Sequence, residues 1–81
     1  MATITYDYSK LRGLIKEKYS TISLFSQDLG ISQTSLSQKL NNKVSFSQIE
    51  IDKAKRLLGI KDSEIADIFF KEKIRKTVQL D

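Results

Sequence analysis

Apolar residues recur at three- and four-residue spacing along most of this chain, which is the spacing of one face of an α-helix. No segment alternates in the manner of a β-strand before the last ten residues. The pattern therefore predicts five short helices. Their core-facing residues are expected to be Leu11, Leu14, Ile15 and Tyr19; then Ile22, Phe25 and Leu29; Leu36 and Leu40; Ile51, Ala54, Leu57 and Leu58; and finally Ile65, Ile68 and Phe69.

Short polar residues that can cap a helix precede each apolar stripe. They are Asp7, Thr21, Ser32, Ser47, and Asp62 or Ser63. Ser47 is followed three residues later by Glu50, which is the spacing of a capping box. Gly30 and Gly59 follow the second and fourth stripes, where a residue of positive φ commonly ends a helix. Asn42, in the connection after the third helix, is also expected to adopt a positive φ.

The length of 81 residues suits one domain, and we expect residues 1–69 to form it. Residues 70–81 form a tail with three open alternatives: an extension of the fifth helix, a strand, or a mobile segment. Phe70, Ile74, Val78 and Leu80 lie in this tail. They can form a dimer contact, a patch for a partner, or simply packing against the domain.

The composition excludes several kinds of bond and site. Because the chain has no Cys and no His, it lacks disulfides, thiolate nucleophiles, imidazole bases and the usual zinc ligands. It also lacks a glycine-rich phosphate cradle, since its three glycines stand far apart. We therefore expect no enzyme activity, no cofactor and no metal. With no apolar run of about 18 residues and no signal pattern, the expected location is the cytoplasm.

The net charge of +4 and a pI near 9.4 hint at a polyanionic partner. Their distribution is more informative than their total. No carboxylate occurs between Asp28 and Glu50, whereas Lys39 and Lys43 lie inside that window. One surface of the protein can therefore approach phosphates without repulsion.

The third predicted helix has an unusual outer face. Only Leu36 and Leu40 are large apolar residues that can anchor it. The turn "GIS" before it is short, so the second and third helices are expected to cross steeply, and the third to project. Glutamine can bind adenine through two hydrogen bonds, and hydroxyls suit several base edges. The predicted base contacts are Gln33, Thr34, Ser35 and Gln38, with Ser37 on the same outer face.

The segment "TISLFSQDLGISQTSLSQKLNNK", followed by a helix ending "AKRLLGI", resembles the Cro/phage-repressor (XRE-like) helix-turn-helix family. The similarity runs from about Tyr8 to Ile60 and is most specific in the spacing of Ser26, Gly30 and Leu36. The stretches "YDYSKL" and "KLNNKVSFS" resemble small regulators of temperate phages in Gram-positive hosts, which implies that the cytoplasm is that of a bacterial host cell. The resemblance implies an all-α, five-helix, lambda-repressor-like DNA-binding domain whose helix-turn-helix is formed by the second and third helices.

The resemblance also implies roles for individual residues. Gln33, Thr34 and Gln38 fall at the family's base-reading positions. The expected phosphate contacts are Ser23, Ser32, Ser37, Lys39, Asn41, Asn42, Lys43 and Ser45. Such domains usually bind double-stranded DNA as homodimers, on near-palindromic operators with half-sites about 34 Å apart. Phe70, Ile74 and Val78 are the candidate dimer contacts.

Three positions depart from the family pattern. Ser26 replaces the usual Ala, so its hydroxyl must find a local backbone acceptor. Ile22 stands where a glutamine often contacts phosphate and braces the first base-reading residue. Lys39 replaces an apolar residue, and we expect its stem to lie on the surface with the ammonium reaching a phosphate.

The leading hypothesis is a sequence-specific DNA-binding transcriptional regulator, a Cro-like repressor that reads operator bases with its third helix. The alternative is a protein-interaction module, a modulator or antirepressor that binds another repressor and blocks its DNA-binding face. A charge of +4 is light for an autonomous DNA-binding protein. A third hypothesis is the antitoxin of a toxin pair. Salt-dependent binding to DNA separates the first from the second.

Overall fold

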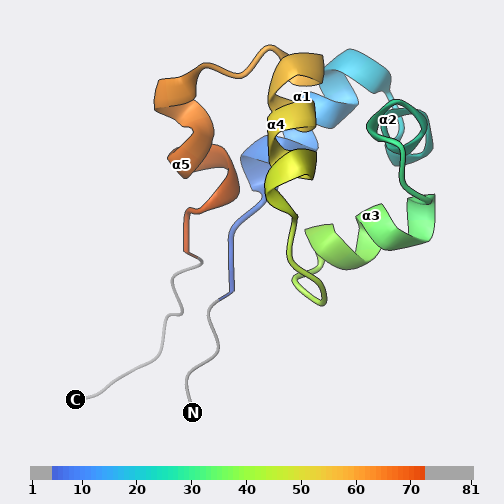
Figure 1. Ribbon diagram of the computed structural model, residues 1–81, viewed down its shortest axis with the longest axis horizontal. Helices are drawn as coiled ribbons and strands as arrows, with labels where there is room; N and C mark the ends of the chain where they lie inside the picture. Colours follow the sequence, from blue (N-terminus) through green and yellow to red (C-terminus); the bar gives the residue numbers. More distant parts are fainter. Residues whose placement is uncertain (1–4, 73–81) are drawn as a thin grey trace.

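The computed structural model describes residues 5–72, and helices make up most of this range (Figure 1). The predicted all-α class with five helices is confirmed. In residues 5–72, no helix is long and apolar enough to cross a membrane. The elements are α1 (Ser9–Tyr19), α2 (Ile22–Leu29), α3 (Gln33–Leu40), α4 (Gln48–Leu58), a 3₁₀ turn η1 (Asp62–Glu64) and α5 (Ile65–Phe69).

One hydrophobic core lies between α1, α2, α4 and α5, and α3 adds its inner edge. Each predicted stripe faces this core. Six of the stripe residues lie half-buried at its margin: Leu14, Tyr19, Ile22, Ile51, Leu57 and Ile65. Burying a leucine, isoleucine or phenylalanine side chain stabilises a fold by about 1.5–3 kcal/mol, so these stripes determine which helices meet. The fully buried large side chains are Phe25, Phe69, Leu11, Ile15, Leu36 and Leu58.

The predicted boundaries of the middle helices are confirmed. The hydroxyls of Thr21, Ser32 and Ser47 each accept a hydrogen bond from the backbone N–H three residues ahead, at 3.2, 3.0 and 3.1 Å. Gly30 and Gly59 end α2 and α4 with φ values of 86° and 68°. An L side chain rarely adopts this left-handed conformation, which explains why glycine occupies both positions.

The first and fifth helices begin differently from the prediction. Asp7 accepts a hydrogen bond from the Ser9 N–H at 2.9 Å, but the N-cap residue of α1 is Tyr8. No side-chain cap precedes α5, so the expected cap from Asp62 or Ser63 is wrong. The chain instead enters α5 through η1, whose start is held by a hydrogen bond from the Lys61 N–H to Glu64 at 3.1 Å.

The N-terminal segment is fixed from two sides. Tyr6 forms an isolated antiparallel bridge with Glu72, and the Asp7 N–H donates to the Lys71 carbonyl at 2.7 Å. On the other side, the Asn42 side chain accepts from the Tyr6 N–H at 2.8 Å and donates to the Tyr6 carbonyl at 2.9 Å. Asn42 reaches this position with a φ of 64°, as predicted. Figure 1 shows the two end segments running side by side below α1 and α5.

The pairing at Glu72 bears on the alternatives for the tail. The α5 helix ends at Phe69, and residues 71–72 pair with the N-terminal segment. Phe70, a candidate dimer contact, is 49% exposed, and its ring and the Tyr6 ring pack edge-to-face with centroids 6.1 Å apart. Ile74, Val78 and Leu80 lie outside the described residues.

The double hydrogen bond from Asn42 provides a test of this arrangement. Replacing Asn42 with Gly keeps the positive φ free of strain but removes both bonds to Tyr6. We expect the free energy of unfolding, measured by chemical denaturation, to fall by about 1–3 kcal/mol. Asn42→Ala should be less stable than Asn42→Gly, because it adds backbone strain. Wild-type stability in the glycine variant would contradict a structural role for the amide.

Candidate functional site

The α3 helix projects from the body of the protein. Figure 1 shows α2 nearly end-on, while α3 runs across the view below α2 and apart from α5. Leu36 and Leu40 are 0% and 3% exposed and attach α3 to the core, as predicted. Ser26 is buried beneath the turn, and its hydroxyl donates to the Ser23 carbonyl at 2.7 Å. The local acceptor that the sequence required for Ser26 is therefore present.

The outer face of α3 is polar and uncharged. Gln33, Thr34 and Gln38 are exposed, whereas Ser35 and Ser37 are half-buried. The Ser32 hydroxyl accepts from the Ser35 N–H and donates to the Ser35 hydroxyl, both at 3.0 Å. Ser32 and Ser35 are thus engaged in capping α3. The amides of Gln33 and Gln38 and the hydroxyl of Thr34 face solvent.

Lys39 lies inside the protein rather than on its surface. Its side chain contacts Glu50 at 3.1 Å and donates to the Ser45 carbonyl at 3.0 Å. Only 9% of the residue is exposed. The expectation that its stem lies on the surface is wrong, because this position of α3 faces the start of α4. The buried ammonium thus links α3 to the connection and to the first turn of α4.

The Glu50 carboxylate is shared between this ion pair and the capping box of α4. It accepts from the Ser47 N–H at 2.8 Å and pairs with Lys39. Burial by itself raises the pKa of Glu50, but the hydrogen bonds from Ser47 and Lys39 outweigh burial and leave the pKa lowered. Glu50 is thus held ionised, with its charge balanced by Lys39.

The remaining predicted phosphate contacts divide into three groups. Asn41 accepts from the Arg12 guanidinium at 3.0 Å, and both ends of the Asn42 amide bind Tyr6. In contrast, Lys43 and Ser45 have exposed side chains. Ser23 and Ser37 are half-buried. The structure therefore leaves fewer accessible groups at the end of α3 than the sequence predicted.

Two residues near the ends of α2 affect this surface: Lys53 lies near its C-terminal end, and Ile22 is at its start. A Cβ atom added to Gly30 would lie 3.3 Å from the Lys53 ammonium, so this cation rests against the C-terminal end of α2. The carbonyls at such an end carry partial negative charge, which the ammonium offsets. Ile22 packs against the core at the start of α2, so no amide stands there to brace Gln33.

Exposed apolar residues follow α3, and the sequence analysis missed them. Val44 is 47% exposed in the connection, and Ile49 is 79% exposed in the first turn of α4. The signal was available for Ile49, because it falls off the stripe formed by Ile51, Ala54 and Leu58. We give the name α3 surface to six exposed residues of α3, of its connection to α4 and of the first turn of α4: Gln33, Thr34, Gln38, Lys43, Val44 and Ile49.

The α3 surface has no acid-base or metal chemistry of its own. Its members are amides, a hydroxyl, one ammonium and two aliphatic side chains. Within residues 5–72, acidic side chains form no group of three that could hold a metal ion. The arrangement is suited to recognition of another macromolecule by hydrogen bonds and apolar contact.

Comparison with known proteins gives the family. The model of the family described as "Protein of unknown function (DUF739)" matches residues 4–72. The chain belongs to the DUF739 family. The matched range of the family includes every helix in Figure 1 and the paired end segments. No curated protein matches the sequence.

A solved structure is similar to this DUF739 protein over most of both chains. It is the solution structure of the modulator of repression (MOR) of the temperate bacteriophage TP901-1 from Lactococcus lactis. The identity is 42% and the TM-score is 0.71, over 80% of this chain and 88% of that chain. The chain is thus similar in sequence and fold to a phage regulatory protein.

The buried ion pair leads to a test by mutation and pH. Replacing Lys39 with Met leaves Glu50 partly buried without its cation, so we expect a loss of about 1–3 kcal/mol in the free energy of unfolding at neutral pH. The contribution of ionised Glu50 is present above its ordinary pKa of 4.5 and is lost as pH falls through the lowered folded-state pKa. The deficit of the variant should therefore shrink in acid.

Glu50→Gln is the matched control for this test. Glutamine can keep the capping hydrogen bond to Ser47 but carries no charge for Lys39. Its stability should depend less on acid pH than that of the wild type. A Lys39→Met deficit that stays constant from neutral to acid pH, measured by urea denaturation, would count against the pairing as the cause.

Proposed function

We propose that this chain is a modulator of repression, a small protein that binds a phage repressor through the α3 surface and keeps that repressor from its operator. The observation that carries the proposal is the 42% identity to the modulator of repression of phage TP901-1 over 80% of the chain. The exposed groups of the α3 surface add two independent physical arguments.

The first argument concerns charge. Proteins that bind DNA gain much of their affinity by neutralising several phosphates with Lys and Arg. The window from Leu29 to Ile49 contains no carboxylate and two lysines. Lys39 is buried and paired with Glu50, so Lys43 is the exposed cation of this window. Lys53 adds a second cation near the α2–α3 turn. This supply is small for tight binding to DNA.

The second argument concerns apolar surface. Val44 and Ile49 stand exposed in the segment that follows α3, where the helix-turn-helix resemblance expects phosphates. An aliphatic side chain gains nothing from a phosphate, but it contributes to protein interfaces when it is removed from water. Polar, uncharged Gln33, Thr34 and Gln38 beside them can pair with neutral hydrogen-bonding groups of a protein. The α3 surface thus favours a protein partner.

The experiment that tests the proposal uses a preformed complex of labelled operator DNA and the phage repressor. Adding the purified chain should release the repressor from the DNA, read by fluorescence anisotropy, without a shift of the DNA by the chain alone. Binding of chain to repressor should change little between about 50 and 200 mM salt, a range over which phosphate-driven binding falls steeply. Release that fails at saturating chain, or a salt-sensitive shift of the DNA by the chain alone, would contradict the proposal.

A second candidate function is sequence-specific binding of operator DNA by a helix-turn-helix formed by α2 and α3. The observation that favours it is the exposed, carboxylate-free outer face of α3, with Gln33, Thr34 and Gln38 free to reach base edges. In this case the chain acts as a Cro-like repressor, as a dimer on a near-palindromic operator.

Ile49→Lys separates the two candidates by the sign of its effect. If the partner is a repressor protein, burying a lysine in place of the isoleucine should weaken binding by about tenfold or more. If the partner is DNA, the added cation should strengthen binding and raise the salt slope by about 1. Ile49→Thr, which is neutral and also β-branched, controls for shape. The stability of both variants should stay within about 0.5 kcal/mol of wild type, since the site is exposed.

Gln33→Ala tests the second candidate at a single residue. On DNA it should relax base preference at one half-site position at a cost of about 1–3 kcal/mol, measured by binding to a library of operator variants. Gln27→Ala, an exposed amide on α2, is the control and should leave base preference unchanged. If Gln33→Ala discriminates at every operator position as the wild type does, Gln33 does not read a base.

A further inference from the structure

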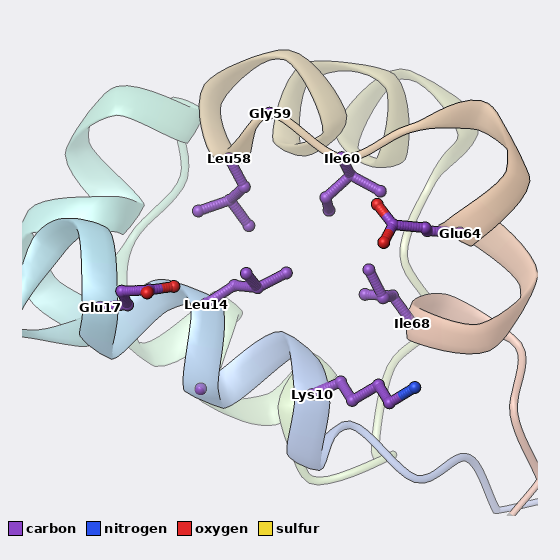
Figure 2. A pocket seen from close by; sticks show the side chains of 9 residues that line it. Lys10, Leu14, Glu17, Leu58, Gly59, Ile60, Glu64 and Ile68 are labelled. Carbon is purple, nitrogen blue, oxygen red and sulfur yellow. The ribbon is translucent and has the colours of Figure 1, made fainter.

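A cavity of about 350 Å³ opens between α1, the Gly59–Ile60 bend and α5 (Figure 2). The side chains of Leu14, Leu58, Ile60 and Ile68 point toward one another around it and form an apolar wall. Three of them are nearly fully buried, whereas Leu14 is half-buried and forms the accessible part of the wall. The cavity belongs to the α1–α5 side of the protein and shares no residue with the α3 surface.

Gly13 lies in the middle of α1 and lines this cavity. Glycine in a helix interior costs up to about 1 kcal/mol relative to alanine. Within this chain that cost has no packing reason, because a Cβ atom added at Gly13 would meet nothing within 4 Å. The absent side chain keeps the cavity open toward solvent. Gly13 therefore leaves room in the cavity that no side chain of the described residues occupies.

The charged side chains at the cavity give it an acidic character. Lys10, Glu17 and Glu64 line it. Lys10 is already paired with Asp67 of α5, and this pairing raises the pKa of Lys10. Glu17 and Glu64 supply the carboxylates of the lining, and Figure 2 shows them on either side of the apolar wall. Glu64 also accepts a hydrogen bond from the Lys61 N–H at 3.1 Å, but this bond to the backbone leaves its negative charge at the rim. On a chain of net charge +4, this acidic opening contrasts with the carboxylate-free α3 surface.

We propose that this cavity is a docking site for an apolar side chain carried on a basic segment of a partner protein. The cavity receives an aliphatic or aromatic side chain against Leu14, the accessible part of its wall. Lysine or arginine residues next to that side chain in the partner then lie near Glu17 and Glu64. The charge of the rim selects the basic partner, since an acidic segment would meet like charges.

The occupant contacts α1 and α5, so the site is separate from the one proposed for the repressor. A chain that binds partners on both sides can hold a repressor at α3 and a second protein segment at the cavity. Binding at the cavity does not require a particular partner at α3.

The test uses two probes and the full chain. One probe is a short helical peptide of leucine and lysine; the other is the same peptide with every lysine replaced by glutamate. Binding is followed by amide chemical shifts in ¹⁵N-labelled protein, where Gly13 and Gly59 report on the cavity itself. The lysine peptide should give saturable shifts at both glycines, and the glutamate peptide should give none.

Two variants and their matched controls complete the test. Gly13→Leu fills the cavity and should abolish saturable binding, whereas Lys18→Leu adds the same side chain elsewhere on α1 and should bind as wild type. Glu17→Lys reverses one rim charge and should weaken binding by about fivefold or more. Asp52→Lys makes the same change on an exposed part of α4 and should have no effect. Thermal unfolding verifies that Gly13→Leu is folded; its stability should be at or above that of wild type.

Three results would overturn the proposal. The first is an absence of saturable shifts at Gly13 and Gly59 with the lysine peptide. The second is equal binding of the two peptides, which would remove the role of the acidic rim. The third is undiminished binding by folded Gly13→Leu, which would place the peptide elsewhere. None of these readouts involves the repressor. A negative result here therefore leaves the proposed function unaffected, and a failure of the proposed function leaves the docking site unaffected.

Discussion

The position of α3 depends on polar contacts at its C-terminal end. Two leucines attach the helix to the core, and this narrow edge alone leaves the helix able to rotate or tilt. The Lys39 ammonium removes that freedom by binding Glu50 at the start of α4 and the carbonyl of Ser45 within the connection. Asn42 extends the same fixation to the N-terminal segment. These directional contacts, together with the packing of Phe46 against Tyr8 and Phe69, keep the outer face of α3 in a defined orientation.

The parts of this structure that follow from neighbouring residues were accessible from the sequence. Helical stripes, the caps at Thr21, Ser32 and Ser47, and the positive φ of Gly30 and Gly59 all arise within one or two turns of chain. The prediction failed where a side chain bonds to a residue distant in the sequence, or where packing between helices determines whether it is buried. Lys39 faces Glu50 across a loop, which no local rule for lysine indicates.

The candidate site shows the same division. That α3 would present amides and hydroxyls followed from its pattern, because Gln33, Thr34 and Gln38 lie off the helical stripe formed by Leu36 and Leu40. The accessibility of each group did not follow. Ser32 and Ser35 serve the cap, Asn42 binds a backbone 36 residues away, and Ile49 faces solvent. Polar residues near a predicted binding helix are thus as often structural as available for a partner.

The pairing of Tyr6 with Glu72 has a consequence for how this fold can be joined to other chains. It brings the entry and exit of the helical unit next to each other, at one end of the molecule. A unit whose two ends are adjacent can be inserted into a surface loop of a host protein, or circularly permuted, without separating its helices. The same adjacency allows two such units to be connected in tandem by a short linker while each keeps its own helical packing.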